Sequence, residues 1–484
     1  MFDELRTRAL VFMGRSLCPP LVVVSGLSLM PLLSGCIFSS DRPDLSLDLP
    51  DAYLAARGNV HTALPALDWW RTFRSGELTR FIEEAQTANL DIAAAIGRIM
   101  QADAQSKIAG APLLPTVTFA GSGARIRPAG GPERGDYRAI LNASYQLDFW
   151  GQNAANSRAA EESAVVARFN KEVVVLSTIV SVGTAYFNIL TAQDRLRIAR
   201  ENLAAATRIL TLVQQRAEQG TASALDVAQQ QSLVDTIRAG IPLFDETLRQ
   251  NIAVLAALMG RPPERLVVQG GSLYRLAVPL VTPGLPSELL FQRPDIRAAE
   301  ASLKSADASV EAARAAFYPN ISLTGQGGYE STALRLLFTP QNALYNLAQN
   351  VTQPIFDGYI LEGRLEFAKG QQFELLKTYC QTVLTGFRDV EIALIAVADS
   401  AERERLQNAV VTSSRRAFQL AETRLREGVA DLVVVLQTQQ TLFTAEDAQV
   451  LDRQARLQAA LSLFQALGGG WLPPGVGAGP ILLQ

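Results

Sequence analysis

Two long stretches of the chain carry apolar residues spaced three and four apart, the pattern of a helix with one buried seam. The first spans residues 151–219, which contain no proline and only two glycines, Gly151 and Gly183. The seam continues in a second helix from about Ser223, where Pro242 is the expected kink. At about 1.5 Å per residue the first helix would be ~100 Å long, far beyond a helix of an ordinary globular domain.

Short segments with a period of two lie between the helices. Apolar residues alternate with polar ones from Leu141 to Phe149, and the same alternation occurs in the segments 117–120 and 321–324. An apolar and a polar face on strands of about ten residues are typical of a membrane β-barrel wall, although a half-buried sheet of a soluble domain has the same pattern. The segments 128–136 and 331–342 are the expected exposed loops.

The whole pattern is written twice, and similar segments recur after 204 to 209 residues. The pairs are Leu114-Pro115 with Tyr318-Pro319, Trp150-Gly151 with Asp357-Gly358, Gly220 to Leu225 with Gly428 to Val433, and Ala257 to Gly260 with Ala466 to Gly469. This indicates two structural repeats of the order helix, strand, strand, long helix, helix. The predicted divisions are 36–75 (N-terminal segment), 76–262 (first repeat), 263–290 (linker), 291–467 (second repeat) and 468–484 (C-terminal segment).

Two strands per repeat give four per chain, which is too few to close a barrel. An open sheet edge in lipid would leave backbone groups without hydrogen-bond partners, at a cost of several kcal/mol each. If these strands cross a membrane, several chains must therefore share one barrel. The seams of the long helices require the same symmetric assembly.

The N-terminus predicts a secreted lipoprotein. Three arginines precede an apolar stretch at 17–33, which ends in Leu-Ser-Gly-Cys at 33–36. This tetrapeptide resembles the bacterial lipobox, so residues 1–35 are the expected signal peptide and Cys36 the lipidated first residue. A transmembrane anchor is the alternative, and Met13 competes with Met1 as the start.

Composition excludes several classes of function. The formal net charge of −3 includes no basic block, so no nucleic-acid partner is expected. His61 is the one histidine of the chain, which argues against histidine-dependent hydrolysis and against a zinc site. Nothing pairs a nucleophile with a base, and there is no phosphate-binding Gly-Lys-Ser/Thr loop. We therefore expect no enzyme, no catalytic residue, no metal and no cofactor apart from the lipid on Cys36.

The chain resembles the TolC family of outer-membrane efflux channels, in particular its lipoprotein branch (NodT-like and OprM-like). The resemblance rests on Trp69 to Phe73, on Asn89 to Ile92 with Ala94, Arg98 and Ala102, and on Gln292 to Arg297 with Ala299 and Glu300. It implies an α+β membrane protein: a homotrimer in which four strands per protomer form a shared twelve-stranded barrel above a long α-helical tunnel. Its location would be the outer membrane, lipid-anchored and extending into the periplasm.

The resemblance also implies a function. The channel would passively conduct drugs or other small molecules, delivered by an inner-membrane pump of the resistance-nodulation-division (RND) type through a periplasmic adaptor. A conduit for type I protein secretion, a metal-cation efflux channel and a periplasmic scaffold without a pore are the alternatives. The sequence does not identify the exported compound.

Two groups of residues are the candidate sites. The hairpin tips, Gly220, Thr221, Ala222, Ser223, Gly428, Val429, Ala430 and Asp431, are the expected adaptor contacts, because small loop residues allow another hairpin to approach. Ser223 and Asp431 also fit plain helix caps. The resemblance places a periplasmic gate at Leu420 and Glu422, with Arg424 or Arg426 as the partner of Glu422, although a solvated helix face explains these residues equally well.

Overall fold

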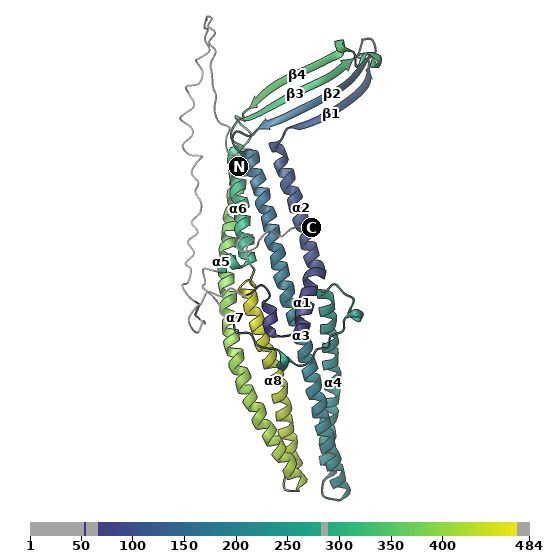
Figure 1. Cartoon of the computed structure of the whole chain (residues 1–484), viewed down its shortest axis with the longest axis vertical. Coiled ribbons are helices and arrows are strands. Elements are labelled where there is room, and N and C mark those ends of the chain that lie inside the picture. Colours follow the sequence, from purple (N-terminus) through teal and green to yellow (C-terminus); the bar gives the residue numbers. More distant parts are fainter. Residues whose placement is uncertain (1–52, 55–65, 282–288, 472–484) are drawn as a thin grey trace, which may run out of the picture. The chain divides into compact units, whose positions relative to one another are not determined.

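The computed structural model describes residues 53–54, 66–281 and 289–471 (Figure 1). Its helices are α1 (Gly76–Ala88), α2 (Leu90–Gly110), α3 (Gln152–Glu218), α4 (Ala224–Leu258), α5 (Leu289–Gln292), α6 (Pro294–Ala315), α7 (Ile360–Arg426) and α8 (Leu432–Ala466). Its strands are β1 (Thr116–Ile126), β2 (Arg134–Leu147), β3 (Asn320–Ser331) and β4 (Ala343–Thr352). The predicted signal peptide and Cys36 lie outside the described residues.

The order of elements occurs twice, as α2-β1-β2-α3-α4 and as α6-β3-β4-α7-α8 (Figure 1). Both long helices, α3 and α7, contain 67 residues, and both returning helices, α4 and α8, contain 35. Each long helix is therefore ~100 Å in length. Pro242 lies inside α4, which continues past it to Leu258.

An aspartate before each long helix accepts hydrogen bonds from the first turn. The Asp148 carboxylate accepts from the backbone N–H of Asn153 (3.0 Å) and Ala154 (2.8 Å). Asp357 accepts from the N–H of Leu361 (2.9 Å). Gly151 (φ 74°) and Gly358 (φ 70°), which the sequence comparison pairs, both adopt the left-handed conformation just before these helices. The two capping aspartates differ in position relative to these glycines, since Asp148 lies three residues before Gly151 and Asp357 directly precedes Gly358.

The four strands form one antiparallel sheet in the order β1-β2-β3-β4. The two repeats meet at its centre, where β2 pairs with β3 from Tyr137 opposite Ser331 to Leu147 opposite Ile321. Strands β1 and β4 are its edges, and in the described part of the chain neither edge has a further strand beside it. The sheet is therefore open on both sides.

The strand boundaries differ in part from those expected. The pairing of β1 with β2 continues to Ile126 opposite Arg134, so the first loop spans 127–133 and the predicted loop 128–136 was too long. Strand β2 ends at Leu147 because Asp148 turns to cap α3, which leaves Phe149 outside the sheet. The second loop agrees with the structure, since β3 ends at Ser331 and β4 begins at Ala343. Strand β4 corresponds to none of the predicted segments.

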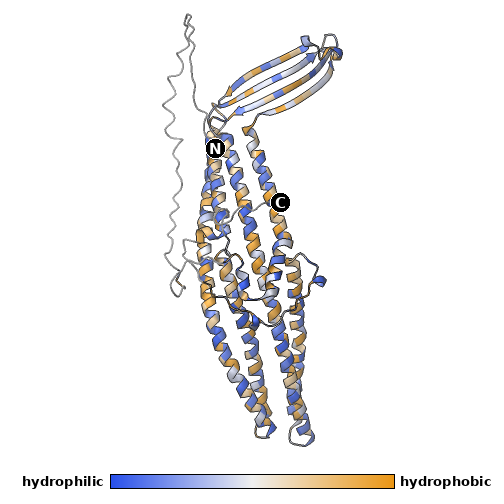
Figure 2. Ribbon diagram, in the orientation of Figure 1, coloured by the Kyte–Doolittle hydropathy of each residue, from blue (hydrophilic) through white to orange (hydrophobic). Residues whose placement is uncertain are grey.

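Apolar and polar residues alternate along the four strands (Figure 2). The register places apolar residues opposite apolar ones and polar opposite polar, which gives the sheet one apolar and one polar face. Phe119 lies opposite Leu141 on one face, whereas Thr118 lies opposite Asn142 on the other. The apolar residues of the edge strands remain exposed, with 70% exposure for Phe119 and 81% for Leu347. A single chain therefore leaves this apolar face uncovered, as expected of a barrel wall that faces lipid rather than of a soluble sheet.

The main hydrophobic core joins both repeats in the middle of the helices. Trp69 stacks on Phe464 of α8 with ring centroids 4.5 Å apart, and Phe73 packs on Phe187 of α3 at 5.3 Å. Helix α3 contains a stretch long and apolar enough to cross a membrane, but 56% of it is buried inside the protein. The apolar stretch of α3 is therefore explained by its packing in the core.

The connection between the repeats runs across this core and is tied to it by polar side chains. The buried Asp194 carboxylate accepts from Ser272 Oγ (3.0 Å) and from the N–H of Leu273 (2.9 Å). Glu77 accepts from the N–H groups of Gln269 (2.8 Å) and Gly270 (3.0 Å). The described part of the linker, residues 263–281, is therefore an ordered strap across the helices.

Candidate functional site

Both helical hairpins turn through the same structure at their tips. The N–H of Thr221 donates to the carbonyl of Arg216 (2.8 Å), and the N–H of Val429 donates to that of Arg424 (2.9 Å). Gly220 (φ 73°) and Gly428 (φ 79°) adopt the left-handed conformation that ends a helix in this motif. The predicted tip residues therefore lie where the chain reverses between α3 and α4 and between α7 and α8.

The predicted caps are present on the far side of each turn. Ser223 Oγ accepts from the N–H of Asp226 (3.2 Å), whose carboxylate in turn accepts from the N–H of Ser223 (2.8 Å). Asp431 Oδ1 accepts from the N–H of Val433 (3.1 Å). Ser223 and Asp431 thus start α4 and α8, and a capping role leaves the rest of each tip free for a partner.

The two tips are also joined to each other. Arg216 Nη1, at the end of α3, donates to the carbonyl oxygen of Leu425, near the end of α7, at 2.8 Å. Below this bond, Val213 of α3 packs in one apolar cluster with Phe418 of α7 and Leu432 of α8. This bond and this cluster connect the two hairpins near their tips.

The tips expose four apolar side chains, of which Val429 was predicted as a tip residue and Leu225, Val433 and Val434 were not. Leu225 and Val429 are each 64% exposed, Val433 is 52% exposed and Val434 is 47% exposed. The signal was available in the sequence, since Val433 and Val434 belong to a run of three valines of which a helix can bury only part. These side chains give each tip an uncovered apolar surface suited to a protein partner.

The candidate gate residues divide between two faces of α7. Residues two apart on a helix are turned by about 200° from each other, so Leu420 and Glu422 cannot face one axis together. Leu420 is 48% exposed and is in phase with Arg424, four residues later. Glu422 accepts a hydrogen bond from Arg426 Nη2 at 3.1 Å. The predicted pair of Glu422 with Arg426 is thus formed within one helix, and Leu420 and Glu422 lie on different faces of α7.

The Arg-Pro-Asp-Ile segment forms a joint between the start of the second repeat and the end of α8. Arg293 donates to Asp295 (2.6 and 3.0 Å), to Asp389 (3.4 Å) and to the carbonyl oxygen of Ala466 (3.2 Å). Burial would lower the pKa of Arg293, but the hydrogen bond and charge of Asp295, with Asp389, raise it above the ordinary arginine value. Gly468 (φ 84°) passes so close to the carbonyl oxygen of Gln292 that a Cβ at this position would clash with it.

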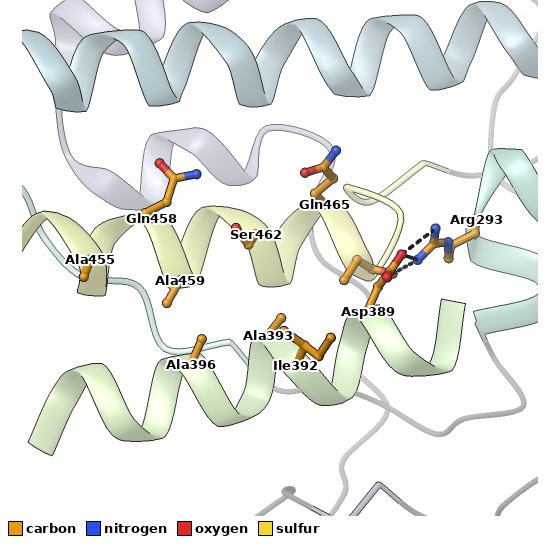
Figure 3. A pocket seen from close by; sticks show the side chains of 11 residues that line it. Arg293, Asp389, Ile392, Ala393, Ala396, Ala455, Gln458, Ala459, Ser462 and Gln465 are labelled. Carbon is orange, nitrogen blue, oxygen red and sulfur yellow. Dashed lines mark hydrogen bonds and ion pairs between the residues drawn. The ribbon is translucent and has the colours of Figure 1, made fainter. Parts of the chain in front are cut away.

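An open cavity beside Arg293 lies between α7 and α8 (Figure 3). Its walls are mostly small side chains, namely Ala393, Ala396, Ala455, Ala459, Ser462 and Ala466. Arg293 and Asp389 close one end of it, and dashed lines in Figure 3 mark their contact. The walls supply no set of groups suited to catalysis.

The helices form a layer with two free edges, as the sheet does. Helix α3 contacts α2, α4, α6 and α8, and α7 contacts α6 and α8. Helices α2 and α4 therefore lie at one edge of the described layer and α7 at the other. On α7, Phe373, Leu384, Ile395 and Leu406 recur at every eleventh residue and are 48–54% exposed. At the opposite edge, α2 exposes Ile96 (45%) and Met100 (68%), and α4 exposes Leu243 (62%).

Comparisons with known proteins agree with this architecture. The family model described as "Outer membrane efflux protein" matches residues 81–261 and 285–469. The chain is 37% identical over 453 residues to the pyoverdine export outer membrane protein OpmQ of Pseudomonas aeruginosa, covering 91% of this chain and 95% of that protein. It is 32% identical over 463 residues to the toluene efflux pump outer membrane protein TtgF of Pseudomonas putida, covering 92% and 96%.

Solved structures show the same fold. The outer-membrane channel OprN superposes with a TM-score of 0.84 at 25% identity, over 90% of this chain and 100% of that one. The MtrE outer membrane channel of Neisseria gonorrhoeae superposes with a TM-score of 0.81 at 27% identity, over 89% and 97%. The chain thus has the trimeric TolC-like fold, in which four strands per protomer contribute to a shared barrel above a helical tunnel.

The matched family consists of channels rather than enzymes, and its members are located in the outer membrane. The expectations of family, fold class, location and general function are therefore confirmed. The chain belongs to the outer membrane efflux protein family and is an outer-membrane channel component of an efflux system.

Proposed function

We propose that three copies of this chain close into one channel that passively conducts small molecules out of the periplasm. The observation that carries the proposal is the pair of free edges: one chain ends in β1, α2 and α4 on one side and in β4 and α7 on the other. Each edge exposes backbone or apolar side chains that no other described segment of the chain covers, and a second chain would cover them. Contact between unlike edges is head-to-tail and closes a ring when the rotation fits.

The apolar faces of α7 and the number of strands both support a closed ring of three chains. Helix α7 already buries one face inside its own chain, through Val383, Val390 and Val411 among others, and its exposed apolar residues lie on the opposite side. A helix that is apolar on two faces needs partners on both. Four strands from each of three chains give a barrel of twelve, wide enough for an aqueous pore.

The partners we propose are a periplasmic adaptor and an inner-membrane pump of the RND type. The adaptor would meet the exposed apolar side chains of the tips, Leu225, Val429, Val433 and Val434. The energy for export would come from the pump, since the sequence contains no nucleotide-binding loop. We further propose that the mature chain begins at Cys36 and carries lipid there, which would anchor it to the outer membrane.

For the cargo we propose a small organic molecule, with a pyoverdine-like compound as the first candidate. The two OpmQ proteins are 36% and 37% identical to this chain, whereas the toluene, solvent and antibiotic channels are 30–32% identical. Growth and export assays on a deletion strain test this choice. Loss of protein secretion or of metal-cation resistance, with small-molecule export intact, would favour a secretion conduit or a metal channel instead.

A gate near the second tip is part of the proposal. One of the two α7 faces, that of Leu420 with Arg424 or that of Glu422 with Arg426, would line the tunnel where the hairpins converge. Conductance of Leu420→Ser and Glu422→Ala trimers separates the two, because only the residue that narrows the tunnel raises the conductance when truncated.

The central experiment measures mass and conductance of the same preparation. We expect the purified protein in mild detergent to have the mass of three chains, and to form discrete conductance steps in planar bilayers. A single-chain particle that leaves bilayers silent would contradict the proposal.

A further inference from the structure

The charged residues of the sheet are confined to one end of it. Within the four strands they are Arg125, Arg134, Asp136, Arg138 and Glu330, all within six residues of the loops that join β1 to β2 and β3 to β4. The remaining polar residues of the strands are serine, threonine, asparagine, glutamine and tyrosine. Charge therefore enters the strand wall only as a band at its loop end.

The register places most of this band on the polar face. Arg138 lies opposite Ser122 on β1 and opposite Glu330 on β3. Asp136 and Arg134 are in phase with Arg138, and therefore with Asn142 and Ser144. Arg125 is different, because it is in phase with Val117 and Phe119 on the apolar face. In a barrel the polar face lines the water-filled interior, so four of the five charges face the pore.

Arg138 connects the two carboxylates of this band. Its Nε donates to Asp136 Oδ1 at 2.9 Å, and its Nη2 lies 3.2 Å from Glu330 Oε1 across the β2–β3 pair. These groups border an open cavity with Gln341 and Asn342 of the second loop. The three side chains are 28–46% exposed, so their ion pairs add little to the stability of the fold. Their expected effect is on the electrostatic potential inside the pore.

We propose that Arg138 sets the charge selectivity of the outer mouth by cancelling Asp136 and Glu330 together with Arg134. The four groups sum to zero in each chain, two positive and two negative charges. From this band to the helices the strands carry no charged residue, so the balance within the band is what leaves anionic and cationic cargo with similar access. The inference rests on the proposed channel function, because it requires the polar face to line a pore.

The test is the reversal potential of open channels in planar bilayers under a potassium chloride gradient. Arg138→Gln leaves one net negative charge per chain in the mouth, so we expect the permeability ratio of K⁺ to Cl⁻ to rise about twofold or more at ~0.1 M salt, where the Debye length is about 10 Å. Glu330→Gln is expected to lower the ratio. The double variant and Arg138→Lys are expected to restore the wild-type value.

Arg125→Gln is the matched control. It also removes an arginine from the loop end, one whose Nη1 lies 3.8 Å from Glu133, but on the apolar face. We expect no change in the ratio. Trimers of all variants are checked by their mass in detergent, so that a folding defect is separated from a change in selectivity.

The outcomes distinguish the two proposals. Wild-type trimers without conductance would overturn the channel proposal itself. Conducting Arg138→Gln trimers with an unchanged ratio, or an equal shift with Arg125→Gln, would overturn the role of Arg138 and leave the channel proposal standing.

Discussion

At the scale of single residues, the Glu404 carboxylate of α7 forms ion pairs with two arginines of α8. Its side chain is almost fully buried, and its oxygens lie 3.2 Å from Arg453 Nη1 and 2.6 Å from Arg456 Nη1. Arg453 Nη2 also donates to the carbonyl oxygen of Leu276 in the strap (2.6 Å). Glu404 therefore links α7, α8 and the connection between the repeats.

We expect Glu404→Gln to destabilise the protein by about 3 kcal/mol, because it leaves buried arginine charge without a counter-charge. The measurement is the midpoint of thermal unfolding in detergent. Glu402→Gln is the control, since Glu402 pairs with Arg405 on the exposed surface and its loss should leave the midpoint unchanged. Equal shifts for both variants would show that burial does not decide the effect.

A second residue prediction concerns pH. Burial raises the pKa of Tyr186 to about 12, aided by the nearby Glu77 carboxylate. The folded state thus favours the neutral phenol, whereas an unfolded tyrosine titrates near pH 10. Stability contributed by this group is complete below about pH 10 and falls as the pH rises toward about 12. Between these pH values the unfolding midpoint of the wild type should fall more steeply with rising pH than that of Tyr186→Phe, which has no phenol to titrate. Parallel curves would contradict the assignment.

At the scale of elements, the tips separate a structural role from a binding role. Ser223→Ala removes the cap of α4, and we expect a loss of about 1 kcal/mol of local stability, seen as faster amide exchange in the first turn of α4. Val429→Asp changes a side chain that is 64% exposed and places a charge on the apolar surface of the tip. It should weaken adaptor binding at least tenfold in a titration with the purified adaptor and leave amide exchange unchanged. Normal adaptor binding by Val429→Asp would remove this surface as the docking site.

At the scale of the whole molecule, the edge of α7 decides assembly. Ile395 is 48% exposed in the single chain and sits in the row that recurs every eleventh residue. We expect Ile395→Asn to shift the trimer toward single chains in detergent, because a polar side chain replaces apolar surface that a neighbour would bury. Ile395→Leu keeps that surface and should stay trimeric. If Ile395→Asn remains fully trimeric, this row does not lie at a contact between chains.

Much of the fold could be predicted from the sequence because its signals are local. The absence of proline and the three-and-four spacing determine α3 and α7, and Gly220, Gly428, Ser223 and Asp431 mark the turns by backbone conformation and capping. Alternation identified β1, β2 and β3. Strand β4 was not predicted because Gln349 interrupts the alternation, although Tyr345, Leu347 and Val351 lie on the same face.

Other features of the candidate site depend on which segments meet, and no local pattern contains that information. The bond from Arg216 to Leu425 and the contact of Arg138 with Glu330 each join residues about 190 or more positions apart. Leu420 and Glu422 lie on different faces of α7 because of the helical repeat, which the sequence contains. Which face of α7 is covered depends on its packing against α8, which the sequence does not contain.

By itself, then, the sequence determined the two repeats, the long hairpins and the two-faced strands, since periodicity and caps act over a few residues. Only the tertiary structure decided that β2 and β3 pair at the centre while β1, β4, α2, α4 and α7 remain as edges, because strand register and helix neighbours are set by contacts between distant segments.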